Sequence, residues 1–151
     1  MPKFTLDTNV VVDALRVPEE LRGLKAFLQR ALPVTYLSAV VLQELEAGVS
    51  SARQADLLEE QLVGPFERRG RVFAPTARAW RRNGSLLGRL QRGQHRPPPS
   101  ALSNDLLLAL SCREQGMTLI TRDTDFRRLT PLVPGLQVVL PYPDLPSRVP
   151  G

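Results

Sequence analysis

The sequence predicts an α/β fold: a three-layer α/β/α sandwich in which helices cover both faces of a small, mainly parallel sheet. Short apolar runs rich in β-branched residues alternate with longer amphipathic stretches. Glycine and proline mark many of the changes from one kind of segment to the next. Strands separated by helices favour crossover connections, which make neighbouring strands parallel.

Length and composition indicate one domain. The chain has 151 residues, of which 42% are hydrophobic. We expect residues 1–140 to form this domain and residues 141–151 to form a proline-rich tail, extended or disordered. No apolar run approaches the ~20 residues of a membrane span, and no signal pattern opens the chain, so a cytoplasmic location is expected. One cysteine and one histidine leave carboxylates as the groups for any chemistry.

The elements can be placed in order along the chain. Pro18 is tolerated in the first turn of a helix, Ser38 is placed to cap the third helix, and Gly48 falls near that helix's end. Gly64 and Pro65 weaken the fourth helix. The expected strands are residues 3–6, 33–38, 71–74, 117–121 and 136–141, and the expected helices are residues 8–16, 18–32, 39–49, 51–70, 75–93 and 101–116. A loop is expected at 94–100, because three consecutive prolines continue neither a helix nor a ladder.

Acidic residues follow the predicted strands. Asp7 comes directly after the first strand, and Asp123 comes shortly after the fourth. Glu44 lies in the helix that the second strand feeds, and Asp105 lies near the start of the last helix. Because the carboxyl ends of parallel strands meet at one edge of the sheet, these four acids can converge there. Close carboxylates repel unless a cation neutralises them. Hard oxygen ligands favour one or two Mg²⁺ or Mn²⁺ ions, which could clamp a phosphodiester and activate a water.

Each acid also has a purely structural interpretation. Helical spacing places Glu44 and Glu46 on opposite flanks of an apolar stripe, so periodicity does not choose between them. The alternatives are a helix cap for Asp7, a first-turn acid for Asp105, and turn residues for Asp123 and Asp125. The argument for a metal site therefore rests on the joint placement of the acids.

Positive charge is concentrated in one segment. The net charge is +5, and residues 66–96 hold nine arginines against one acid, Glu67, which gives +8 there and −3 (5 − 8) elsewhere. Arginines share one face of the predicted helix 75–93: Arg78, Arg82, Arg89 and Arg92. This face could follow RNA phosphates, or it could be a solvated face or meet an acidic partner. Trp80 is expected in the core. Arg122 could contact a phosphate or be an ordinary surface arginine.

Four segments together resemble a known family. They are LDTNVVVDAL, LSAVVLQELEAG, NDLLLALSCREQGMTLITRDTDF and GLQVVLP. In this order they resemble the PIN domain, and among PIN proteins the VapC-type toxins of toxin–antitoxin modules. The resemblance runs from about residue 3 to residue 140. It implies a Mg²⁺- or Mn²⁺-dependent endoribonuclease, commonly a homodimer, whose acidic site a cognate antitoxin blocks.

The resemblance also implies roles for individual residues. The family acids fall on Asp7, Glu44, Asp105 and Asp123, with Asp125 as an assisting acid. It favours Glu44 over Glu46, because Glu44 precedes leucine in the matching pair. Asn9, Ser38 and Thr121 match polar positions that orient the acids or waters. This sequence departs from the family in its longer proline-rich insert before Asp105 and in its lack of a closing tryptophan.

Other functions were weighed. A catalytically silent PIN-like module that binds RNA or protein would typically lack one or more of the acids, and all four are present. A PIN nuclease in RNA processing would have the same site as a toxin. An aspartyl phosphatase would need a second aspartate two residues after the first, and that position is Asn9.

Overall fold

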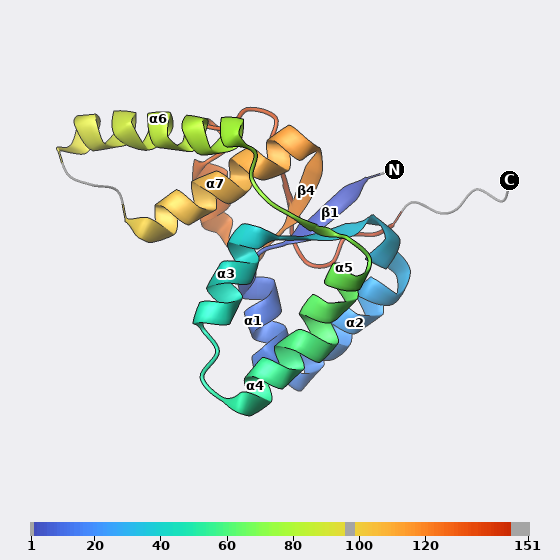
Figure 1. The fold of residues 1–151 in the computed structure, drawn as a ribbon. Coiled ribbons are helices and arrows are strands. Elements are labelled where there is room, and N and C mark those ends of the chain that lie inside the picture. The colour runs from blue at the N-terminus through green and yellow to red at the C-terminus, as the bar shows by residue number, and fades with distance from the viewer. Residues whose placement is uncertain (1, 96–98, 146–151) are drawn as a thin grey trace, which may run out of the picture.

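The computed structural model describes residues 2–95 and 99–145 and contains one parallel sheet (Figure 1). Its strands are β1 (Lys3–Leu6), β2 (Thr35–Ser38), β3 (Val72–Phe73), β4 (Met117–Ile120) and β5 (Gln137–Val139). They are arranged in the order β3-β2-β1-β4-β5, and every neighbouring pair is parallel. Because β1 lies between β2 and β4, the ends of all three strands meet at one edge. This confirms the predicted sheet.

Helices cover both sides of the sheet, as predicted. In Figure 1, α6 and α7 lie above the sheet, and α1, α2, α4 and α5 lie below it. The α-helices are α1 (Thr8–Arg16), α2 (Pro18–Ala31), α3 (Ala39–Ala47), α4 (Ala52–Leu57), α5 (Gly64–Arg68), α6 (Ala77–Gln94) and α7 (Ser100–Gln115). A π-helix, η2 (Leu58–Val63), and two 3-10 helices, η1 (Leu32–Val34) and η3 (Thr124–Arg128), complete the elements.

Side-chain caps set several helix boundaries. The Ser38 hydroxyl accepts a hydrogen bond from the Val40 N–H and begins α3 where the sequence predicted it. The helix predicted from residue 75 begins two residues later, because the Thr76 hydroxyl accepts the hydrogen bond from the Ala79 N–H. At Gly116 the backbone turns left-handed, with φ of 70°, and ends α7.

The helix predicted over residues 51–70 is divided into three parts. The chain passes from α4 through the π-helix into α5, with Pro65 in the first turn of α5. Proline has no N–H to donate, and its ring crowds the carbonyl four residues earlier, so an ordinary α-helical turn is disfavoured there. The wider π-turn accommodates this break while the segment keeps its direction.

One core assignment was wrong. The Trp80 side chain, expected in the core, is 57% exposed. The face of α6 that packs inward carries Ala79, Asn83 and Leu86. Trp80 therefore lies outside the α6–α7 interface, because one residue along a helix turns about 100° from Ala79.

The chain after β5 packs onto α2. Tyr142 stacks on Phe27 with ring centroids 5.2 Å apart, and Phe27 meets Phe4 edge-on at 5.9 Å. Residues 141–145 thus contribute to the packing, which composition did not indicate, while residues 146–151 of the predicted tail lie outside the described part. The domain boundary at residue 140 stays a prediction. Within residues 2–95 and 99–145, no helix is long and apolar enough to span a membrane.

Candidate active site

Asp7 lies at the carboxyl end of β1 and is nearly buried, with 5% of its surface exposed. Its backbone N–H donates to the Ile120 carbonyl at 2.9 Å, which joins the ends of β1 and β4. Its Oδ1 accepts from the Thr8 N–H at 2.8 Å, so Asp7 does cap α1. Its Oδ2 accepts from the Thr121 hydroxyl at 2.7 Å and from Asn9 Nδ2 at 3.1 Å. The cap and the polar cluster are therefore two roles of one carboxylate.

Thr121 connects the aspartates at the end of β4. Its hydroxyl donates to Asp7 and accepts from Asn9 Nδ2 and from the Asp123 N–H, both at 3.0 Å. Its own N–H donates to the Val139 carbonyl at 3.0 Å, which fixes it between β4 and β5. These bonds fix the position of the Asp7 side chain relative to the Asp123 backbone.

Glu44 faces α1. Its Oε1 accepts from the Thr8 hydroxyl at 2.9 Å, and its side chain is half-buried. Glu46, the alternative that periodicity left open, is exposed. Thr8 was not among the site residues predicted from the sequence. Only the position of Thr8 directly after Asp7, at the start of α1, could have indicated that its hydroxyl faces α3.

Asp105 is electrostatically coupled to the other acids. Burial, together with repulsion from Asp7, Glu44, Asp123 and Asp125, raises its pKa to about 7. Burial also raises the pKa of Asp7, while the hydrogen bonds from Thr121 and Thr8 oppose the rise. Carboxylates on α3, α7, β1 and the segment after β4 are thus near enough to repel one another.

The donor chemistry of this cluster suits a hard divalent cation, because it consists of carboxylate oxygens. Within residues 2–95 and 99–145, no three Asp, Glu, His or Cys side chains already stand in an arrangement that would hold a metal ion. Mg²⁺, however, is usually held by one or two carboxylates together with water and substrate oxygens. The residues fit such an open site rather than a complete protein cage.

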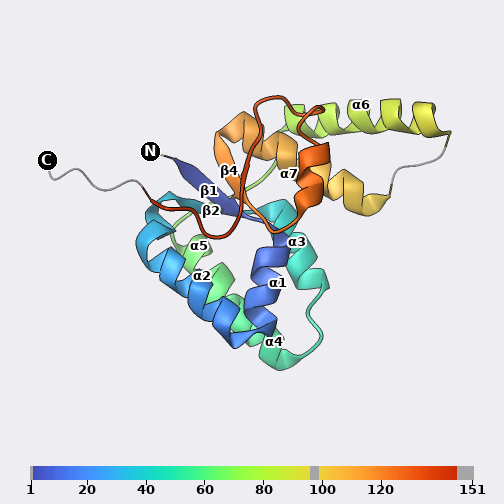
Figure 2. The same ribbon diagram turned by 180° about the vertical axis from the view of Figure 1, so that it is seen from behind.

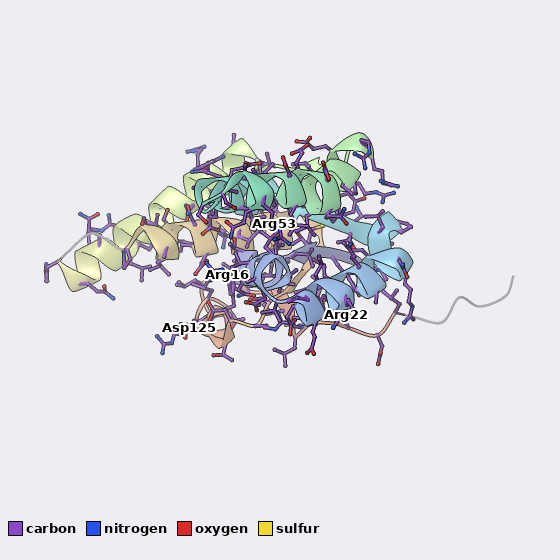
Figure 3. The ribbon with its side chains drawn as sticks, turned by 90° about the horizontal axis from the view of Figure 1, so that it is seen from below. Arg16, Arg22, Arg53 and Asp125 are labelled. Carbon is purple, nitrogen blue, oxygen red and sulfur yellow. The ribbon has the colours of Figure 1, made fainter. Side chains whose placement is uncertain are left out.

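The remaining polar candidates occupy the edge of the cluster. Ser38 is buried, and its hydroxyl accepts from Val40 N–H. Asp123 caps η3 by accepting the Asp125 N–H at 2.8 Å. The Asp125 side chain is exposed and lies 3.8 Å from Arg128 Nε (Figure 3).

The Arg122 side chain pairs with acids outside the candidate site. Its backbone N–H donates to Asn9 Oδ1 at 3.2 Å. Its guanidinium pairs with Asp13 at 3.0 Å and also with Glu20. Arg122 thus links the end of β4 to α1 and α2, so its arrangement here is structural. The predicted phosphate contact stays a prediction.

Three arginines line a pocket between α6 and α7. This pocket has a volume of about 310 Å³ and is lined by Arg78 and Arg82 of α6, by Arg113 and Glu114 of α7 and by Pro134. Arg113 Nε donates to the Pro134 carbonyl at 2.9 Å, which orients this guanidinium. Arg89 and Arg92, the other two members of the predicted stripe, are exposed. Arg113 was missed by the sequence analysis, since it lies on a different helix from the stripe.

Comparisons with known proteins agree on the fold. Similar solved structures include DNA-bound VapBC from Salmonella typhimurium, with 20% identity, a TM-score of 0.67, and coverage of 93% of this chain and 98% of that chain. FitAcB from Neisseria gonorrhoeae has 20% identity, a TM-score of 0.61, and coverage of 89% and 95%. VapBC2 from Rickettsia felis, bound to a promoter DNA fragment, has 23% identity, a TM-score of 0.56, and coverage of 91% and 97%.

At these identities the structures show a shared fold and no more. A search of curated protein sequences finds no match. The family model described as the PIN domain matches residues 4–130, which is most of the chain. Both Asp7 and Asp123 lie inside this match, as do Glu44 and Asp105. This protein therefore belongs to the PIN domain family.

Proposed function

We propose that this protein is a Mg²⁺- or Mn²⁺-dependent endoribonuclease that hydrolyses RNA phosphodiester bonds, and that it is the toxin of a toxin–antitoxin pair. PIN domains form a family of nucleases. The observation that carries the proposal is the pKa of Asp105, which burial and repulsion from four other carboxylates together raise to about 7. Such repulsion at the edge of a parallel sheet is what a bound divalent cation would relieve.

In this proposal the acids hold the metal ions, and neighbouring polar residues position the acids. Asp7, Glu44, Asp105 and Asp123 would hold one or two ions, with Asp125 assisting. The ion would supply a Lewis acid for the phosphoryl oxygens and an activated water for hydrolysis. Asn9 and Thr121 hold Asp7 Oδ2 by hydrogen bonds, so this carboxylate needs no reorganisation to bind a cation. Ser38 acts indirectly, by fixing the start of the helix that carries Glu44.

The arginine pocket supports a polyanionic substrate. In the described part of the chain, Arg78, Arg82 and Arg113 have no carboxylate within ion-pair distance. Three guanidinium groups outnumber the one carboxylate that lines the pocket, Glu114, and such a surplus favours phosphate ligands, which guanidinium groups contact in a bidentate manner. We propose that this pocket and the exposed Arg89 and Arg92 bind the RNA backbone.

A groove supports the antitoxin part of the proposal. A groove of about 600 Å³ runs between α1–α2 and the α4–η2 segment, with Leu21 and Leu57 among its apolar lining. It shares Leu15 and Gln54 with a smaller pocket that reaches Glu44. Arg16 and Arg53, which Figure 3 labels, are among its lining residues. A partner segment lying here would end at the acids. The similar VapBC structures support an antitoxin partner, and a homodimer is the accompanying expectation.

Two alternatives share this site. A silent PIN-like module that binds RNA or protein would not need four coupled acids, and a PIN nuclease in RNA processing would differ only in its partner. The presence of Asp7, Glu44, Asp105 and Asp123 around one edge favours a nuclease over the silent module.

The test is cleavage of an RNA pool with structured and single-stranded regions, in Mg²⁺, Mn²⁺ or EDTA. We expect cutting by the wild type that requires the metal and that Asp7→Asn and Asp105→Asn both abolish. Glu44→Gln and Glu46→Gln form a matched pair on α3, and we expect only the first to lose activity. Binding without cutting in any metal would contradict the nuclease and favour the silent module.

The toxin role has its own test. Expression of the wild type should arrest growth of a bacterial host, and Asp7→Asn should not. Efficient cleavage without arrest would favour the role in RNA processing.

A further inference from the structure

A second pocket opens directly beside the acids. It has a volume of about 220 Å³ and lies between the end of β4, the start of η3 and the β5 strand. Its lining joins two residues of the candidate site to polar and apolar residues outside it: Thr121, Asp123, Thr124, Thr130, Leu136, Val138, Val139 and Leu140. Figure 2 shows the chain from η3 to β5 as an orange-to-red path on the rear face.

We propose that this pocket, the β4–β5 pocket, binds the nucleobase next to the scissile phosphate and so sets the base preference of cleavage. The inference rests on the proposed function, because it requires an RNA phosphate at the acids. Asp123 belongs to both the acidic cluster and the pocket wall. A phosphate held by this cluster therefore has a neighbouring nucleotide within reach of the pocket.

The acids themselves cannot select a sequence. Contacts to phosphate position a nucleic acid, whereas contacts to bases specify it. Proteins that read single-stranded RNA commonly splay a base out of its stack and enclose it. A pocket contiguous with the site is the place where this can occur.

Size distinguishes this pocket from the pocket beside Glu44. The pocket beside Glu44 has a volume of about 90 Å³, equal to roughly three water molecules at 30 Å³ each. The β4–β5 pocket, at about 220 Å³, equals roughly seven water molecules. Only the latter has room for a base, and it is smaller than the pockets of roughly 300–1,000 Å³ that enclose drug-sized ligands.

The lining has the mixed chemistry that a base requires. Leu136, Val138 and Leu140 offer apolar contact to the ring face, and Leu140 is 65% exposed, which is unusual for a leucine. At the edge, Thr121 already donates to Asp7 and accepts two hydrogen bonds. Thr124 is exposed and lines the pocket, so its hydroxyl is placed to read the base edge.

Filling the pocket tests the inference. Val138→Phe would occupy the space, and Thr124→Val would remove a hydroxyl at an exposed position. Gln137→Phe is the matched control, because Gln137 is exposed on the same strand and does not line the pocket. Cut ends from a randomised single-stranded RNA in Mn²⁺ would be sequenced. We expect Val138→Phe to flatten the base preference at one position beside the cut, Thr124→Val to change it, and Gln137→Phe to retain it.

A binding measurement in Ca²⁺, a hard cation that also binds carboxylate oxygens, gives a second readout. A short single-stranded oligonucleotide would be compared with the same oligonucleotide carrying one abasic residue at each position in turn. We expect one abasic position to weaken binding to the wild type about tenfold and binding to Val138→Phe by less than twofold. A folded Val138→Phe protein with an unchanged base profile would overturn the inference while leaving the nuclease intact. If the wild type cuts no RNA, the nuclease proposal fails. If the wild type binds all of the abasic oligonucleotides equally, the inference that the pocket binds a base fails independently of the nuclease.

Discussion

The Thr121 hydroxyl donates a 2.7 Å hydrogen bond to Asp7 Oδ2, although the two residues are 114 positions apart in the chain. The bond is buried, and it joins the carboxyl ends of β1 and β4. It also opposes the rise in the pKa of Asp7 that burial causes. One hydroxyl thus both positions this carboxylate and favours its ionised form.

Removing this hydroxyl should impair the site more than the fold. We expect Thr121→Val to reduce metal-dependent cleavage 10- to 100-fold, as loss of an orienting partner behind a metal ligand typically does. It should also shift the acidic limb of the pH–rate profile upward, because the pKa of Asp7 loses a lowering contact. Thr118→Val is the control, since Thr118 lies on the same strand and donates to Gln137 instead. Equal effects in both variants would contradict the role given to Thr121.

The raised pKa of Asp105 predicts that the stability of the protein depends on pH. Burial and repulsion raise its pKa to about 7, compared with 3.8 as the ordinary value. Between pH 4 and pH 7 the folded protein then binds more protons than the unfolded chain, so the free energy of unfolding falls as pH rises. Because Asp105 is partly exposed, screening limits this loss to on the order of 1 kcal/mol.

Asp105→Asn should remove that loss. In EDTA at pH 8 we expect its Tm to exceed that of the wild type by about 2–4 °C, with no difference at pH 4. Asp56→Asn, which alters an exposed carboxylate on α4, should leave Tm unchanged at both values. Thermal denaturation followed by circular dichroism would measure this. A gain at pH 4 as large as at pH 8 would show that ionisation of Asp105 is not the cause.

Metal binding should stabilise the protein through the same acids. At a free Mn²⁺ concentration 100 times its Kd, linkage gives about 2.7 kcal/mol, or an increase in Tm of about 5–10 °C. We expect Glu44→Gln and Asp123→Asn to reduce this shift and Glu46→Gln to keep it. The shift should grow as pH rises through 7, because Asp105 must lose its proton to bind a cation. If all of the acid variants retain the full increase in Tm, the cation binds at another site.

Two arginines should respond differently to the same substitution. Arg82→Gln removes a guanidinium of the arginine pocket. The affinity for single-stranded RNA falls as salt rises, and we expect the slope of log affinity against log salt to become shallower by about 0.7. Arg122→Gln breaks the pairs with Asp13 and Glu20. We expect it to lower the free energy of unfolding by about 1 kcal/mol and to leave the salt slope unchanged. A reduced slope for Arg122→Gln would restore its predicted phosphate contact.

Much of the fold could be predicted because local signals suffice for it. The first strand, the first helix and the cap at Ser38 follow from apolar periodicity and hydroxyl caps. The order of polar and apolar residues predicted acids after β1 and β4. Because ligand sites lie beyond the ends of parallel strands, these acids were expected to lie close together. The π-helix was not predictable in the same way, since Pro65 indicates a break without specifying its form.

Residue type and spacing were enough to predict an α/β fold with acids after its strands and arginines in one segment, and four segments of the sequence carried the resemblance to the PIN domain that the family model confirms. The positions of Trp80 and Arg122 could not be predicted in this way, since exposure and ion pairing depend on elements far apart in the chain. The same is true of the contact between Thr8 and Glu44, of Arg113 in the arginine pocket, and of the β4–β5 pocket. Each arises between segments that become neighbours only when the helices pack onto the sheet, and no local pattern records that packing.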